Sequence, residues 1–356
     1  MRHITTTLAA LFWLSLAASA NADMLVGVAA PLSGPSAILG KQIEAGSGLA
    51  AEAQGIAVKT VDDACTADGG AAAARQFVDA KVSVVVGFLC AEAIEAALPI
   101  LKDANIPVIA IGVRTESLTD RRAKTGWPVY RIGPRGDDER NAVATILTRL
   151  WQNDLFAIVD DGTIYGREIA ETFRTAAEQA ALKPVFVDTF RPQLDNQIGL
   201  IGRLKKAGAT KVFAGGDGDD IAIMGRDAAQ LDVGITFAGG ETLRTPTDDV
   251  PYAVGTLMIA LPEWAEIADP EVVQTFGERK IVTDGYTLPA YAAVEVAKAA
   301  TADAESSGKS LAEALTGHDF ATAIGTIRFD EKGDLSQNPF RAFRFDGSHF
   351  VPLEEK

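Results

Sequence analysis

Histidine and cysteine are scarce in this 356-residue chain, and their scarcity limits its chemistry. The chain has three histidines and two cysteines, and only His318 and His349 lie beyond the first few residues. The commonest acid–base and nucleophilic mechanisms depend on a histidine, and zinc sites usually need more Cys or His ligands than this. We therefore predict that the protein is not an enzyme, and we expect no catalytic residue, no metal site and no cofactor.

The motifs of several enzyme classes are also missing. The sequence contains no GxSxG, no HExxH, no GxxxxGK[ST], and no GxGxxG after its first predicted strand. The acid-rich residues 215–220 lack the Gly and Glu that a calcium loop needs at fixed offsets, so they are expected to form a strand-to-helix turn. An α/β hydrolase or oxidoreductase remains the competing class.

Basic residues are outnumbered, with 33 Lys and Arg against 48 Asp and Glu and a formal net charge of −15. Such a surface repels nucleic acid and anionic lipid. Beyond residue 22 no run is long and apolar enough to span a membrane. We expect a monomer that neither binds nucleic acid nor inserts directly into a membrane.

The first 22 residues resemble a secretory signal peptide. Arg2 and His3 precede a short apolar run at 8–18, and Ala20, Asn21 and Ala22 form a small-residue cleavage pattern, so we expect a cut after Ala22. An N-terminal membrane anchor is the alternative, although the run is shorter than the ~20 residues of a membrane span.

The two cysteines of this exported chain are Cys65 and Cys90. A pair of cysteines in an oxidising compartment suggests a disulfide. A zinc site is the weaker alternative, because the remaining histidines are distant in sequence.

Buried strands alternate with helices, which is typical of an α/β fold. A β-branched run at 82–86 and a second apolar run at 108–111 predict strands buried on both faces, with a helix at 91–104 between them. Small molecules bind beyond the carboxyl ends of parallel strands. Residues 88–92 and 113–115 are therefore expected to form a ligand-binding ledge.

The alternation restarts after residues 133–136, which resemble a hinge, and it predicts a second, similar lobe. Asp137 or Asp138 is expected to cap the first helix of that lobe. Strands are also expected at 324–329 and 341–345, around a turn at 330–334.

We predict two Rossmann-like α/β lobes facing each other across a cleft. The chain is expected to cross back near Pro262 and again near Pro339, which makes a hinge of several crossings. Lobe I would then comprise residues 23–133 and 263–338, and lobe II residues 134–262 and 339–356.

Four single residues follow predicted strands at the edge where the lobes would face each other. They are Arg114, Tyr165, Asp217 and Glu241. An Arg and a Glu on opposite sides of a cleft are suited to a small zwitterion, because the Arg pairs with a carboxylate and the Glu accepts from an ammonium. Each residue alone is also compatible with a solvated loop position.

Several motifs together resemble those of the periplasmic leucine/isoleucine/valine-binding proteins of ABC transporters, and the resemblance covers the whole mature chain. They lie at residues 31–35 (PLSGP), 62–65 (DDAC), 86–90 (VGFLC), 165–166 (YG), 237–241 (FAGGE), 291–294 (YAAV) and 330–334 (DEKGD). The resemblance implies a type I periplasmic-binding fold.

The resemblance also implies roles for individual residues. It implies a disulfide between Cys65 and Cys90, an ammonium-binding role for Glu241 and a ligand-lining role for Tyr165. The family's carboxylate-binding hydroxyl is replaced by Ala91, followed by Glu92. The other departures from the family pattern are Val113 and Arg114 at the next strand end, Leu39 near the first loop, and Asp217 in the second lobe.

The resemblance implies a periplasmic solute receptor that binds a small amino acid, amide or related carboxylate and delivers it to an ABC permease in the inner membrane. Arg114 is expected to hold the ligand's acid group, and pairing of Arg114 with Glu92 is the alternative. A ligand sensor that contacts a receptor is the other reading of the same resemblance.

Overall fold

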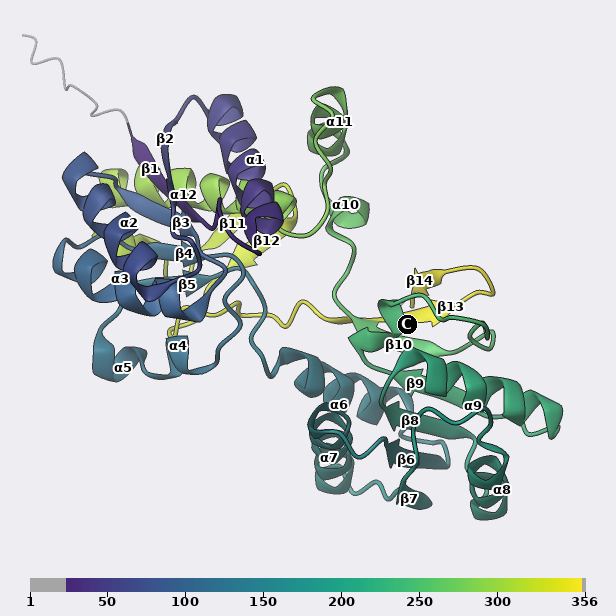
Figure 1. Cartoon of the computed structure of the whole chain (residues 1–356). Coiled ribbons are helices and arrows are strands. Elements are labelled where there is room, and N and C mark those ends of the chain that lie inside the picture. The colour runs from purple at the N-terminus through teal and green to yellow at the C-terminus, as the bar shows by residue number, and fades with distance from the viewer. Residues whose placement is uncertain (1–23, 354–356) are drawn as a thin grey trace, which may run out of the picture.

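The computed structural model describes residues 24–353, which form two large β-sheets flanked by helices and a small two-stranded sheet (Figure 1). The predicted signal peptide, residues 1–22, lies outside the described residues. We call the five-stranded sheet and its helices lobe I, and the seven-stranded sheet and its helices lobe II. The predicted α/β class with parallel-sheet lobes is confirmed. Among the described helices, none has the length and apolar character of a membrane span.

Lobe I is built on a parallel sheet with the strand order β2-β1-β3-β4-β5. Its strands are β1 (Leu25–Ala30), β2 (Ala57–Asp62), β3 (Val84–Gly87), β4 (Val108–Ala110) and β5 (Val129–Arg131). Val84 and Val86 pack into the core on one face of the sheet, and Val85 packs into the core on the other. Burial on both faces explains why these strands are continuously apolar rather than alternating.

The two faces of this sheet carry different helices. α2 (Ala67–Ala80) and α3 (Ala91–Asp103) share one core with Val85, while α1 (Ala37–Gln54) and α12 (Thr287–Ser307) share the other with Val84. Lobe I also contains helices that the sequence did not predict. They are α4 (Ser117–Asp120), α5 (Arg122–Thr125), α10 (Trp264–Ile267), α11 (Pro270–Glu278) and α13 (Leu311–Ala314).

Lobe II is built on a sheet with the order β14-β13-β10-β9-β8-β6-β7, in which β13 pairs antiparallel with both of its neighbours and the other strands pair in parallel. Its strands are β6 (Phe156–Asp160), β7 (Phe186–Thr189), β8 (Lys211–Gly215), β9 (Thr236–Gly239), β10 (Leu257–Ala260), β13 (Arg341–Phe345) and β14 (Phe350–Pro352). Its helices are α6 (Asp138–Leu150), α7 (Ile164–Gln179), α8 (Ile198–Ala207), α9 (Gly218–Gln230) and the short 3₁₀ helix η1 (Glu241–Arg244).

The predicted carboxylate cap of α6 is wrong. Asp137 occupies the N-cap position, but its side chain makes no capping hydrogen bond. Instead Asp137 Oδ1 accepts from Arg135 Nε at 2.8 Å, and Asp138 Oδ2 accepts from the Arg135 backbone N–H at 2.7 Å. Both acids fix the chain just before α6.

The two strands expected around residues 330–334 do not pair with each other. β12 (Gly325–Arg328) pairs with β11 (Asp319–Thr322), a strand that the sequence did not predict. β13 instead pairs antiparallel with β10 in the other lobe. The chain crosses between the lobes in this interval, which separates the two strands.

Three crossings join the lobes, after β5, after β10 and between β12 and β13 (Figure 1). Arg131 Nη2 lies 2.5 Å from Asp334 Oδ1, and these side chains are only 0% and 6% exposed. Arg135 Nη1 lies 2.9 Å from the other oxygen of Asp334. A buried charge is tolerated only when it is paired, so Asp334 ties the third crossing to the first.

Candidate ligand-binding site

A charged residue from each lobe projects into the space between the lobes. β4 ends at Ala110 and its loop carries Arg114, while β9 leads directly to Glu241. Arg114 Nη1 lies 3.7 Å from Glu241 Oε2. Residues that follow parallel strands of two different sheets therefore meet across the cleft.

A cavity of about 250 Å³ surrounds this pair. Its walls come from lobe I, lobe II and the first two crossings. They are Ile111, Gly112, Arg114, Ile132, Gly133, Pro134, Glu241, Arg244, Leu261, Pro262, Glu263, Trp264, Gly285, Tyr286 and Pro289. The cavity is a candidate site for a small molecule held between the lobes.

The Arg114–Glu241 pair is accessible to solvent. The two side chains are 45% and 26% exposed, and exposed ion pairs typically contribute only about 0–1 kcal/mol. The backbone around Arg114 is held more firmly, because the Arg114 carbonyl accepts from the Gly136 N–H at 2.7 Å. The guanidinium is therefore free to change partner while its loop stays attached to the first crossing.

Glu139, in the first turn of α6, organises the lobe II side of the site. Its Oε1 accepts from the Tyr165 hydroxyl at 2.7 Å and from the Glu241 backbone N–H at 2.6 Å. A side chain at Gly240 would collide with the oxygens of both Glu139 and Tyr165. Glu139 thus fixes the backbone of Glu241 and the ring of Tyr165 at once.

The ionisation of this cluster follows from its burial. Burial raises the pKa of Glu139, and the nearby charge of Glu241 adds to the effect, while the hydrogen bonds from the Glu241 N–H and Tyr165 oppose it. Burial and the adjacent Glu139 carboxylate raise the pKa of Tyr165 well above its usual range. Tyr165 is therefore a neutral hydrogen-bond donor at physiological pH.

The other predicted contact residues lie apart from the central cavity. Ala91 and Glu92 begin α3, and Asp217 is exposed at the start of α9. Val113 is 2% exposed and packs in the core of lobe I. The structure thus brings together Arg114, Tyr165 and Glu241, and Arg114 contacts Glu241 rather than the alternative partner, Glu92.

Most of the residues that line or support the cavity were not identified from the sequence, among them Glu139, Tyr286 and Trp264. Glu139 lies in an acidic run that was interpreted as a helix cap. Trp264 begins α10, a helix that the sequence did not predict, and Tyr286 is the residue before α12. The available signal for Trp264 was its position, since it is an aromatic residue two positions after Pro262, where a crossing was predicted.

The predicted disulfide between Cys65 and Cys90 is present, with a Cα–Cα distance of 5.2 Å. It joins the loop after β2 to the start of α3, at the carboxyl edge of the lobe I sheet. Asp63 lies buried beside it, and Asp63 Oδ1 accepts from the Cys65 N–H at 2.9 Å.

The chain is similar to known proteins over most of its length. Residues 24–349 match the family model described as "Periplasmic binding protein". The chain is 28% identical to the "Leu/Ile/Val-binding protein homolog 3" of Brucella melitensis, over 96% of each chain.

Two solved structures share the fold. One, from Rhodospirillum rubrum, is described as a branched-chain amino acid ABC transporter; it has a TM-score of 0.76 and 19% identity, covering 93% of this chain and 99% of that one. The other is an ABC transporter substrate-binding protein from Desulfitobacterium hafniense in complex with Leu; it has a TM-score of 0.62 and 20% identity, with the same shares covered.

Proposed function

The chain belongs to the periplasmic binding protein family, and from that membership we propose that it is the substrate-binding component of an ABC importer. Its proposed ligand is a small amino acid, an amide or a related carboxylate. The observation that carries this proposal is the contact between Arg114 and Glu241, which have opposite charges, come from different lobes and lie 3.7 Å apart.

In this proposal a zwitterion enters by exchanging charged partners. Its carboxylate accepts two hydrogen bonds from the Arg114 guanidinium, and its ammonium donates to Glu241. Each protein side chain then replaces one oppositely charged partner with another, so neither charge is left unpaired. Since the two side chains belong to different lobes, the ligand stabilises the arrangement in which both reach it.

The remaining predicted contacts complete the proposed site. Tyr165 would present its ring and hydroxyl on the lobe II side, held by Glu139. Ala91, Glu92 and Asp217 would approach the ligand from the edges of the two lobes. Val113 would support the Arg114 loop from the core.

The geometry favours binding over catalysis. A hydroxyl–carboxylate pair, Tyr165 with Glu139 at 2.7 Å, supports the backbone of Glu241. Because the pKa of Tyr165 is raised rather than lowered, the pair does not generate a nucleophile. Turnover of a bound ligand would favour the hydrolase or oxidoreductase alternative.

We further propose that the chain is cleaved after Ala22 and acts in the periplasm as a monomer, delivering its ligand to an inner-membrane permease. The proposed lobe boundaries are those given above, residues 23–133 with 263–338 and residues 134–262 with 339–356. A sensor that presents its ligand-bound form to a receptor would use the same cleft. Permease and ATPase genes beside this one would favour transport.

The first test identifies the ligand and then removes its proposed anchor. Mass spectrometry after denaturation identifies whatever co-purifies with the protein, and calorimetry then measures its affinity for wild type and for Arg114→Ala. Loss of a direct charge contact is expected to weaken binding by roughly 2–5 kcal/mol, or about 30-fold to several thousand-fold.

Arg121→Ala is the matched control, because Arg121 is a lobe I arginine that is 51% exposed and paired with Glu95 at 3.4 Å. This variant should bind the ligand like wild type. If Arg114→Ala also retains affinity within a factor of a few, Arg114 does not hold the ligand.

A further inference from the structure

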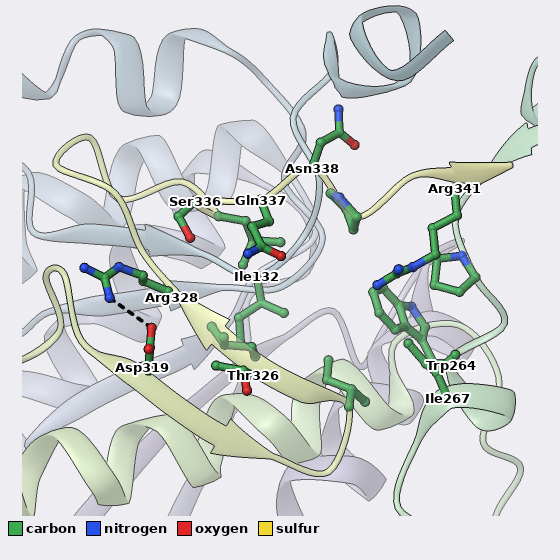
Figure 2. A pocket seen from close by; sticks show the side chains of 15 residues that line it. Ile132, Trp264, Ile267, Asp319, Thr326, Arg328, Ser336, Gln337, Asn338 and Arg341 are labelled. Carbon is green, nitrogen blue, oxygen red and sulfur yellow. Dashed lines mark hydrogen bonds and ion pairs between the residues drawn. The ribbon is translucent and has the colours of Figure 1, made fainter. Parts of the chain in front are cut away.

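A second cavity, of about 220 Å³, lies at the hinge (Figure 2). All three crossings contribute to its walls, through Ile132, through Pro262 and Trp264, and through residues 336–339. The β11–β12 hairpin of lobe I and Arg341 of the lobe II strand β13 complete it. We call this space the hinge cavity.

The hinge cavity and the cleft cavity are neighbours. Ile132, Pro262 and Trp264 line both of them, so these three side chains form the wall between the two spaces. Because both lobes and every crossing line the hinge cavity, rotation of one lobe against the other changes its shape.

The charges around the hinge cavity favour an anion. Arg328 Nη1 lies 3.1 Å from Asp319 Oδ1, and this pair satisfies both groups. The side chain of Arg341, at the other end of the cavity in Figure 2, is exposed and has no hydrogen-bond or ion-pair partner within residues 24–353. A guanidinium without a protein partner is suited to a carboxylate, which it can bind through two charge-assisted hydrogen bonds.

The rest of the lining is suited to an apolar body. Ile132, Ile324, Ile327 and Leu335 contribute branched side chains. Ile267, which also lines the cavity, is 41% exposed, so an occupant would remove apolar surface from water. The volume is below the ~300–1,000 Å³ of sites for drug-sized ligands, which limits the occupant to a small molecule.

We propose that the hinge cavity is a second binding site, which takes a small monocarboxylate with an apolar body. The carboxylate pairs with Arg341, and the apolar body lies against the isoleucines. Trp264 and Pro262 separate this molecule from the ligand in the cleft.

Crystals soaked with 4-bromobenzoate test the site, since anomalous scattering locates the bromine directly. Wild type and Arg344→Ala should show bromine in the hinge cavity, and Arg341→Ala should not. Arg344 is the matched control, because it is an exposed arginine on the same strand and lies outside the cavity lining. Three results would overturn the proposal: bromine bound only in the cleft, bromine in the hinge cavity of all three proteins alike, or no bound bromine in any of them.

Titration in solution gives a second readout. The affinity of 4-bromobenzoate should fall at least tenfold in Arg341→Ala and stay within twofold of wild type in Arg344→Ala. Equal affinity in wild type and Arg341→Ala would show that Arg341 does not hold the carboxylate. Neither experiment requires the cleft ligand to be known, so a failure here is distinct from a failure of the proposed transport function.

Discussion

At the scale of single residues, Glu139 is the group whose ionisation should be visible in the stability of the protein. Its pKa is raised in the folded state, chiefly by burial. The folded protein therefore binds the proton of the Glu139 carboxyl more tightly than the unfolded chain does. The stability that this protonation contributes is lost as pH rises through the folded-state pKa of Glu139. Below the unfolded-state pKa the contribution is fully present.

We predict that Glu139→Gln is more stable than wild type at neutral pH. The amide cannot ionise, yet its oxygen still accepts from Tyr165 and from the Glu241 N–H. The advantage over wild type should shrink as pH is lowered toward the usual range of glutamate. Thermal unfolding of both proteins between pH 4 and pH 8 measures this difference.

The difference between the two proteins is the relevant quantity, because other carboxyls also have raised pKa values. They are Asp63, Asp138, Asp220 and Glu295. Each contributes equally to wild type and variant, so it cancels. A difference that is the same at every pH would mean that Glu139 ionises normally.

The charged residues of the site could be predicted because they interrupt an apolar pattern. Arg114 and Glu241 each follow a buried strand, and parallel strands deliver their ends to one edge of a sheet. Glu139 could not be separated from its neighbours, since an acidic first turn is equally typical of an ordinary helix start. Its hydrogen bond to the Glu241 N–H joins residues 102 positions apart, and no local pattern reports such a distance.

At the scale of secondary structure elements, the long and strongly apolar ones were predictable and the short ones were not. β3 and α3 have the composition of buried elements and were found within one or two residues. α4, α5 and α10 have four residues each, too few for a helical period to be visible. Among the described strands, β11 and β12 pair only with each other, across a tight turn. The sequence therefore did not show that the strand at 324–329 pairs with residues 319–322 and not with the strand at 341–345.

The contact between α1 and α12 leads to a prediction about the stability of the protein. α12 lies about 240 residues after α1, and the two helices pack closely at Gly46, where a Cβ would collide with the carbonyl oxygen of Thr287. Backbone atoms cannot yield as a flexible side chain does, so Gly46→Ala should force α12 outward. We expect a loss of roughly 1–3 kcal/mol in the free energy of unfolding, measured by urea denaturation.

Gly48 provides the control within the same helix, since a Cβ at Gly48 would have no heavy atom within 4 Å. Gly48→Ala should therefore stabilise the protein by about 0.5–1 kcal/mol, because alanine loses less conformational entropy in a helix. Equal effects of the two substitutions would show that helix propensity, and not the contact with α12, governs Gly46.

At the scale of the whole molecule, the three crossings explain why the lobes should move as units. Asp334 ties the first and third crossings together through Arg131 and Arg135. The same crossings are tied again where the Asn338 amide donates to the Asp138 carbonyl at 2.7 Å. Hinges of this kind limit motion to a rotation of one lobe against the other, with little independent motion of each crossing.

A ligand that bridges Arg114 and Glu241 should therefore reduce the radius of gyration, since its favourable contacts exist only when both lobes reach it. We predict a smaller radius by small-angle scattering for the protein saturated with its co-purified ligand than for protein freed of ligand by unfolding and refolding. Arg114→Ala at the same ligand concentration should keep the larger radius. Arg121→Ala, whose ion pair with Glu95 lies within lobe I, should contract like wild type. An unchanged radius on saturation of wild type would mean that the ligand binds to one lobe alone, and that the charge pair between the lobes is not its site.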